Sequence, residues 1–358
     1  MPEFKKGSTF RADLHVHPFP YGGNDTVEQS MQRVIGLPYI LNLVGYCGYN
    51  KLHPRLVSKA REEADRHGRF AKAVAEVATT QGHITISPKE DDDGQIERCA
   101  SAIRKFREKR PTPYDLIASM YEQFGAFAIV DHGNPQGRFA PNIEGMVPVE
   151  IRDLVHLLRD NNIRAAVGIE LDNFIVDQLI GTARHERHQG LIEVADELAR
   201  DGLGVGKVGG SDGGLVGAAY TAFTLDRDLK NVSDLHGAVE SAIYNNQTRS
   251  VLASPIKDFF PVGWLEILQI GLDHKLPRIQ ERMHEGTYPA RWFAKRVNLV
   301  DLYDQHVKKI SSDHFEWRRE LERMKNLAFS DAYHQQLVFS DISPMVVPQS
   351  GTKLALTV

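Results

Sequence analysis

Residues 126–135 read AFAIVDHGNP, a short apolar run that leads straight into Asp-His-Gly-Asn-Pro. A continuous apolar run of this length is typical of a strand buried on both faces, as in a parallel sheet. The same pattern, an apolar run followed by polar side chains, occurs at residues 10–17, FRADLHVH. It occurs again at residues 203–214, LGVGKVGGSDGG. The sequence therefore places chemically active side chains where buried strands end.

Short apolar strands alternate with helical segments as far as about residue 250. This alternation is typical of βα units around a parallel sheet, although it does not by itself separate an open sheet from a barrel. In barrels, the carboxyl ends of the strands carry the chemistry, and the unusual side chains of this sequence lie at such ends. We expect strands at residues 10–16, 39–46, 70–80, 83–87, 126–131, 164–171, 203–208 and 220–225, and helices at 27–35, 54–69, 95–110, 114–124, 149–161, 188–201 and 232–245.

After Pro255 the strand-like runs give way to helical patterns, which predicts a barrel over residues 1–254 and an all-helical extension over residues 255–358. Within the extension, apolar side chains recur at alternating spacings of four and three, as on one face of a long helix. This stripe indicates either a helix packed across the barrel or the seam of a homo-oligomer. Its members are Tyr303, Val307, Ile310, His314, Trp317, Leu321, Met324 and Ala328.

Composition sets limits on the class of protein. The chain has 358 residues, 42% of them hydrophobic and 25% charged, as in a globular protein with a sizeable core. A net charge of −4 supplies no global basic field for nucleic acid or an anionic membrane. Cys47 and Cys99 form no CxxC pair, which argues against a zinc ribbon or a disulfide scaffold. With no apolar leader and no membrane-length apolar run, we expect a cytoplasmic protein.

Residues 13–17, DLHVH, place His15 and His17 two positions apart, so both imidazoles share one face of a strand. Residues 74–84, VAEVATTQGHI, place Glu76 inside an apolar strand and His83 after a glycine turn. A buried carboxylate needs a cation, a hydrogen-bond cage or a proton.

Two further strand ends carry His132 and Asp212. Taken singly, Asp212 could cap a turn, His132 could be a loop histidine and Glu76 could pair with an arginine. Their shared position at strand ends favours a joint role, since imidazole and carboxylate are ligands for Zn²⁺, Mn²⁺ or Fe²⁺. The predicted metal ligands are His15, His17, Glu76, His83, His132 and Asp212.

The order DLHVHP, EVATTQGHITI, IVDHGNP and GGSDGG resembles the PHP (polymerase and histidinol phosphatase) domain family over roughly residues 10–250. The resemblance implies a distorted (βα)7 TIM-like barrel that binds divalent metal ions and hydrolyses phosphate esters. It further implies that His15, His17, Glu76 and Asp212 hold one ion, and that Glu76 bridges to a second ion held by His83 and His132.

Two departures from the family pattern concern its third metal. Residues 47–50 read CGYN where the family has Thr-Asp-His-Asn, and Gly214 stands where it has a histidine. We therefore expect two divalent ions, with Tyr49 and Gly214 side by side and no metal between them. His53, Asp25 or Tyr49 could otherwise restore a third site.

The function implied is hydrolysis of a small phosphorylated molecule, with Glu76, Asp212 and Arg138 as catalytic residues. Fixed cations must replace the phosphate-binding charge of the third ion. The expected substrate-binding residues are Arg138, Tyr49, Arg184, Arg187 and His188, with His185 in the same basic cluster, although that cluster could equally be a solvated start of a helix. Glu170, Asp172 and Asn173 either shape the substrate pocket or form a turn.

Two other functions remain open. Barrels of the amidohydrolase kind, which cleave C–N or C–O bonds, also begin with HxH and end with an aspartate, but the sequence offers no clear lysine for their carbamylated bridge. A non-catalytic descendant that binds a metal or another ligand would fit the loss of the third-site histidines. The retained ligands argue against it, because clustered buried imidazoles and carboxylates are costly without an ion.

Overall fold

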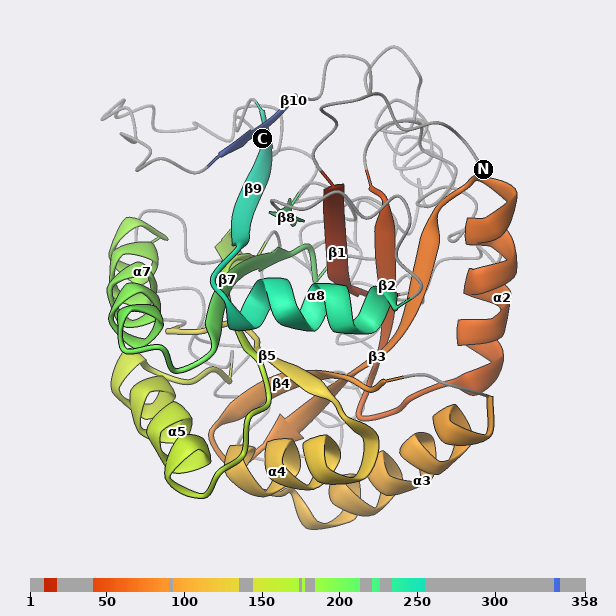
Figure 1. The fold of residues 1–358 in the computed structure, drawn as a ribbon, viewed down its shortest axis with the longest axis horizontal. Coiled ribbons are helices and arrows are strands. Elements are labelled where there is room, and N and C mark those ends of the chain that lie inside the picture. Colours follow the sequence, from red (N-terminus) through yellow and green to blue (C-terminus); the bar gives the residue numbers. More distant parts are fainter. Residues whose placement is uncertain are drawn as a thin grey trace, which may run out of the picture.

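The computed structural model describes residues 10–17, 41–89, 93–134, 144–173, 176–177, 184–212, 221–225, 234–254 and 338–341. Strands alternate with helices through most of this part, and the helices lie outside the strands (Figure 1). None of these helices is both long and apolar enough to cross a lipid bilayer. The predicted helix at residues 27–35 lies outside the described residues.

The strands β1–β9 form a nearly closed, barrel-like mixed sheet in the order β9-β8-β1-β2-β3-β4-β5-β6-β7, and β10 is added to the edge of β9. The sheet is α/β as expected. Its strands are β1 Phe10–Val16, β2 Leu43–Tyr49, β3 Phe70–Thr79, β4 Gly82–Ser87, β5 Phe127–Val130, β6 Val167–Asn173, β7 Val205–Gly210, β8 Thr221–Leu225, β9 Thr248–Ser254 and β10 Val338–Asp341.

The parallel sheet that the alternation of strands and helices indicated is present only in part. Neighbours β1–β2, β2–β3, β5–β6 and β6–β7 are parallel, whereas β4 runs antiparallel to β3 and β5, and β8 runs antiparallel to β1 and β9. The physical reason at β4 is the tight connection at Gly82, whose φ of 142° suits a glycine, because so short a turn can only return the chain antiparallel. As a result β4 starts at the edge where β3 ends.

Two strands differ from the sequence prediction. Residues 39–46 were expected as the second strand, but β2 begins at Leu43 and continues to Tyr49. A Cβ on Gly45 would lie 2.9 Å from Val74 Cγ2 and 3.0 Å from Leu14 Cα, so the flanking strands approach β2 closely there. The strand β9 was not expected, because it carries buried polar side chains such as Ser250.

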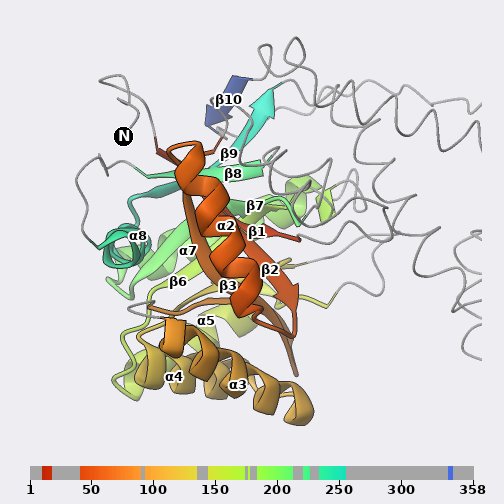
Figure 2. The same cartoon turned by 90° about the vertical axis from the view of Figure 1, so that its right-hand side faces the viewer.

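The helices pack against the sheet around two hydrophobic cores. One hydrophobic core lies between the strands and the outer helices, while a second lies among Phe10, Leu43, Phe127 and Phe223 and includes side chains of α8. Figure 2 shows α8 at the end of the barrel from which β1 and β2 start. The helices are α2 Pro54–Arg66, α3 Asp93–Lys109, α4 Pro113–Phe124, α5 Pro148–Asp160, α7 Arg184–Arg200 and α8 Leu235–Tyr244.

Of the predicted C-terminal extension, only Val338–Asp341 is described, and it is a strand paired antiparallel with β9. The expectation of an all-helical extension is therefore wrong for these residues, since the open edge of β9 offers backbone hydrogen bonds that an extended segment can use. The apolar stripe from Tyr303 to Ala328 lies outside the described residues. The domain boundary at residue 254 and the homo-oligomer seam stay predictions.

Candidate metal centre

The ends of β1 and β7 bring His15, His17 and Asp212 together. The Nε2 atom of His17 lies 3.0 Å from Asp212 Oδ1, and the Nε2 atom of His15 lies 3.5 Å from the same oxygen. The backbone explains this meeting, because the Asp212 N–H donates to the carbonyl of His15 over 2.7 Å. Asp13 strengthens the junction by accepting from the backbone N–H of His15 (3.1 Å) and of Ser211 (3.3 Å).

Glu76 lies between two groups of imidazoles. Its Oε2 lies 3.4 Å from His17 Nε2 and 3.9 Å from His15 Nε2, while its Oε1 lies 2.6 Å from His83 Nδ1 and 3.9 Å from His132 Nε2. Glu76 ends up here because β3 runs parallel to β1, and His83 because β4 starts where β3 ends. A carboxylate with one oxygen toward each group has the geometry of a bridging ligand.

His132 follows β5 with a left-handed backbone (φ 52°), which turns its ring toward the other imidazoles. Its Nε2 lies 3.0 Å from Asp212 Oδ2, and its ring lies 5.2 Å from that of His15 between centroids. Asp212 was expected to contact only the group of His15 and His17. In the structure its second oxygen also reaches His132.

Buried atoms in this cluster fit a cation. Within the described residues, His15 Nε2 and both ring nitrogens of His132 are buried without a hydrogen bond. His15, His17 and Asp212 form one group that could hold a metal ion, and Glu76, His83 and His132 form another, with the ligand atoms of each group within 4.8 Å of one another. Imidazole nitrogen and carboxylate oxygen are the donors that Zn²⁺ and Mn²⁺ accept.

The charges of the cluster are strongly coupled. Burial alone would lower the pKa of His17, but hydrogen bonds to Asp212 and Glu76 outweigh it and raise that pKa to about 9. Burial and the charge of Asp212 act in the same opposed way on His132, whose pKa also rises to about 9. The histidine charges in turn hold the pKa of Glu76 and of Asp212 well below their usual values, despite burial. Each carboxylate therefore stays ionised, as a ligand must.

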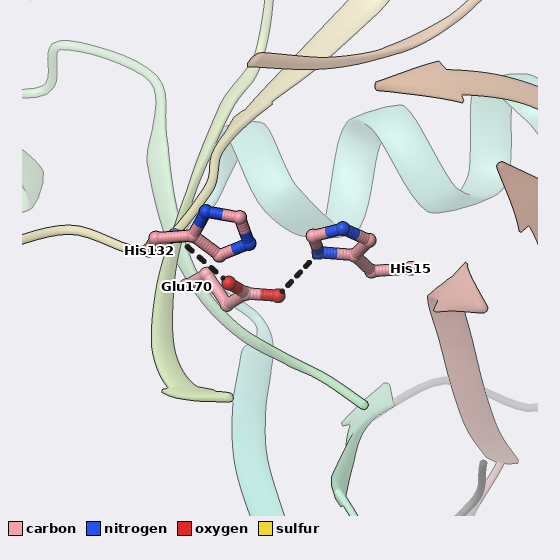
Figure 3. A group of neighbouring side chains, drawn as sticks. All are labelled: His15, His132 and Glu170. Atoms are coloured by element: carbon pink, nitrogen blue, oxygen red, sulfur yellow. Dashed lines mark hydrogen bonds and ion pairs between the residues drawn. The ribbon is translucent and has the colours of Figure 1, made fainter. Parts of the chain in front are cut away.

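Glu170 on β6 is a functional residue whose part the sequence left undecided. Its Oε1 accepts from His15 Nδ1 over 3.0 Å, and its Oε2 accepts from the backbone N–H of His132 over 3.0 Å (Figure 3). Asn173 Nδ2 donates to the same Oε2 over 2.9 Å. Through these hydrogen bonds Glu170 orients two imidazole-bearing residues, and with His15 and His132 it also forms a group whose ligand-type atoms lie within 4.8 Å of one another. A carboxylate within an apolar strand is the signal that also identified Glu76.

Asp131 is a second buried carboxylate that the sequence analysis did not single out. Its Oδ1 lies 3.7 Å from His15 Nδ1, and its Oδ2 accepts from Thr85 Oγ1 over 2.9 Å. Burial raises its pKa to about 8, since the nearby charge of His15 offsets only part of the desolvation. Its position directly before His132 is a signal that sequence alone could have used.

The residues expected at the third-metal position are only partly described. The hydroxyl of Tyr49, which is 52% exposed, lies 3.4 Å from His83 Nε2. His53 precedes α2 with its ring against Gly48 and joins no metal-binding group of the described residues. Gly214, Asp25 and Arg138 lie outside the described residues, as do the side chains of Arg184 and His185.

The expectation that Arg187 binds substrate conflicts with its surroundings. Its side chain is buried and donates to the carbonyls of Gly133 (2.7 Å), Leu171 (2.7 Å) and Glu170 (3.2 Å) and to Asp177 Oδ1 (2.8 Å). These four hydrogen bonds tie α7 to β6 itself and to the segments that follow β5 and β6. Arg187 is therefore a positioning residue, and a basic pattern at the start of a helix could not distinguish the two roles.

Comparisons with known proteins add little to this picture. No family model and no curated protein matches the sequence. A crystal structure at 2.40 Å resolution of a protein from Bifidobacterium adolescentis, proposed to be a metal-dependent phosphoesterase, is similar over 64% of this chain and 94% of its own, with 12% identity and a TM-score of 0.40. A likeness of this degree does not show the family, and the function of this chain has to be argued from its own residues.

Proposed function

We propose that this protein is a metal-dependent hydrolase of phosphate esters with two divalent ions, Zn²⁺, Mn²⁺ or Fe²⁺, at the carboxyl ends of its strands. The observation that carries the proposal is the position of Glu76 between two groups of imidazoles. His15, His17, Glu76 and Asp212 would hold one ion, and Glu76, His83 and His132 the other. The reaction would be that of a phosphate monoester with water, giving an alcohol and inorganic phosphate.

The chemistry divides between the ions and the protein. Bound divalent ions would lower the pKa of a water ligand to near neutral and polarise a phosphoryl oxygen. The chain supplies the arrangement of ligands. Glu170 accepts a hydrogen bond from the Nδ1–H group of His15, which leaves Nε2 of that ring as the ligand atom. Asp212 contacts both His17 and His132, so its charge would help to hold ions bound by either group.

Phosphate-ester hydrolysis is favoured over C–N hydrolysis by two observations. The order of the four motifs resembles that of PHP phosphoesterases. In addition, the lysines that β3 and β7 contribute serve elsewhere: Lys72 donates to the carbonyl of Pro88 over 3.1 Å, and Lys207 pairs with Asp196 over 2.5 Å. Neither is available as the carbamylated bridge of an amidohydrolase, and Glu76 occupies that role.

Arg138 remains the proposed phosphate-binding cation, because it follows His132 by six positions and would lie on the same loop. If so, Arg138→Ala should raise the KM for a phosphorylated substrate by at least tenfold with unchanged metal content. Charge-assisted hydrogen bonds to phosphate are worth a few kcal/mol, which is consistent with this effect. An unchanged KM in a variant with full metal content would remove Arg138 from the site.

The decisive experiment combines metal analysis with a phosphate-release screen over sugar, nucleotide and amino-alcohol phosphates. The wild-type chain should contain at least the two ions of this centre and release phosphate from at least one class of substrate. Glu76→Gln should lose most of its bound metal and most of its phosphate release, because an amide cannot neutralise two cations. The exposed Glu62→Gln on α2 should match the wild type in both measurements. Full metal content without any hydrolysis would instead identify a non-catalytic metal-binding protein. Wild-type metal content in Glu76→Gln would contradict the proposed centre.

A further inference from the structure

A second group of ligand-type side chains lies beside the centre and shares no residue with it. It consists of Asp172 at the end of β6, Asp177 in the segment after β6, and His188 on α7. One ligand atom from each lies within 4.8 Å of the other two, and all three side chains are buried. The sequence analysis expected His188 to bind substrate and left Asp172 open as a pocket or turn residue, but neither was expected to bind a metal ion.

The carboxylates are already held in fixed orientations by the protein. Asp172 Oδ2 accepts from Ser250 Oγ over 2.7 Å, and Asp177 Oδ2 accepts from the backbone N–H of Asn173 over 3.2 Å. Asp177 Oδ1 also accepts from Arg187 over 2.8 Å. These bonds leave Asp172 Oδ1 directed at His188, so the geometry of the group is set before any ligand arrives.

His188 gives the independent sign of a ligand. Its Nε2 lies 2.5 Å from Asp172 Oδ1, yet it makes no hydrogen bond within the described residues. The residue is only 8% exposed, so water does not readily satisfy this nitrogen. A buried ring nitrogen that faces a carboxylate without an aligned hydrogen bond is a donor that a cation can use, if the two side chains separate slightly around the ion.

The charges point the same way. Within this group, two buried carboxylates face the one guanidinium of Arg187. A divalent ion between Asp172, Asp177 and a neutral His188 would add positive charge next to both carboxylates, and buried carboxylates are stabilised by cations. The alternative is a protonated His188 that forms an internal ion pair with Asp172.

We propose that Asp172, Asp177 and His188 bind a further divalent cation of the Zn²⁺ type, separate from the proposed hydrolytic centre. One histidine and two carboxylates form a donor set that Zn²⁺ accepts. Such an ion joins α7 to β6 and, through Ser250, to β9. Because Asn173 and Glu170 belong to the same stretch of β6, the ion stabilises the strand that orients His15.

The test measures metal, not activity. Full-length wild type, His188→Gln and Asp172→Asn are loaded with Zn²⁺, desalted and analysed by mass spectrometry for bound zinc. His156→Gln, an exposed histidine on α5, is the matched control. Both cluster variants should contain one Zn²⁺ per chain fewer than the wild type, and the control should equal it. Asp172→Asn keeps an acceptor for Ser250, so it serves if His188→Gln does not fold.

A second measurement separates this ion from the hydrolytic centre. Glu76→Gln is stripped with EDTA and melted with and without Zn²⁺. Zinc should raise its Tm by several degrees through the cluster, and the rise should vanish in Glu76→Gln combined with His188→Gln. Equal zinc in wild type and both cluster variants, or a Tm of Glu76→Gln that zinc leaves unchanged, would overturn the proposal in favour of the internal ion pair. A failure of the proposed hydrolysis would show separately, as absent phosphate release by the wild type.

Discussion

The carboxylate of Glu170 accepts a hydrogen bond from His15 Nδ1 over 3.0 Å, although the two residues are 155 positions apart in the chain. An imidazole whose Nδ1 carries the proton presents Nε2 as the metal ligand, and a carboxylate partner raises the basicity of that nitrogen. The orientation of His15 is thus decided by β6 as much as by β1.

Glu170→Gln should therefore weaken metal binding without abolishing it. An amide can accept from His15 or from the His132 N–H but not replace both carboxylate contacts, and partners of this kind contribute roughly 10- to 100-fold in metal affinity. Competition titration against a zinc chelator measures the effect. The exposed Glu193→Gln on α7 is the control. Equal affinity in Glu170→Gln and wild type would mean that Glu170 does not orient the ring.

Gly210→Ala should disrupt the hydrogen bond between Glu170 and His15. A Cβ at Gly210 would lie 2.7 Å from His15 Cβ and would also meet Glu170 Oε1, so at least one of these side chains must move. We expect reduced metal content and a loss of stability of about 1–3 kcal/mol, as for other overpacked sites. The comparison is Gly190→Ala on α7, whose Cβ would make only an ordinary contact at 3.4 Å with Pro148. A Gly210→Ala protein with wild-type metal content and Tm would contradict this packing.

Arg187→Met should lower the free energy of unfolding by about 3–5 kcal/mol, the usual effect of removing one partner of a buried ion pair. The change leaves Asp177 without the guanidinium and removes hydrogen bonds to three buried carbonyls. Urea denaturation followed by circular dichroism measures it. Arg200→Met at the exposed end of the same helix should change stability by less than about 1 kcal/mol. An equally small loss of unfolding free energy in both variants would make Arg187 a candidate for substrate binding again.

His236 should make the protein less stable as the pH falls below neutral. Burial, with the charge of Lys72, lowers its pKa from 6.5 to about 3, and its Nε2 donates to the Gly125 carbonyl over 2.9 Å. Because the folded-state pKa lies below the unfolded one, the stabilisation is complete above pH 6.5 and is lost as the pH falls toward 3. Between pH 7 and pH 5 the loss is about 2 kcal/mol, at 1.36 kcal/mol for each pKa unit.

His236→Gln can still donate to Gly125 but does not titrate, so its stability should fall less than that of the wild type over this range. Urea denaturation gives the free energy of unfolding at pH 7 and at pH 5. Its fall between these two pH values should be about 2 kcal/mol smaller in His236→Gln than in the wild type. The exposed His156→Gln should keep the wild-type dependence. Parallel pH profiles for His236→Gln and wild type would show that His236 is not the group responsible.

Much of the candidate metal centre was determined by local sequence. An i, i+2 pair of histidines at a strand end, a carboxylate in an apolar strand and a glycine turn before His83 each specify a side of a strand and an end of it. Because strand periodicity is a short-range property, these patterns also predicted most strands and helices correctly, to within a few residues. They could not fix the bounds of β2, which begins at Leu43 and continues beyond its apolar run to Tyr49.

Tertiary structure alone decided which side chains meet. The contacts of Glu170 with His15, of Asp13 with Ser211 and of Ser250 with Asp172 join residues 155, 198 and 78 positions apart, and no local pattern specifies such pairs. Arg187 belongs with them: its sequence context is that of a solvated helix start, whereas the closure of β6 against α7 buries it. Local periodicity determines the direction in which a side chain leaves its strand or helix. Only the packing of strands distant in sequence determines which residues it contacts.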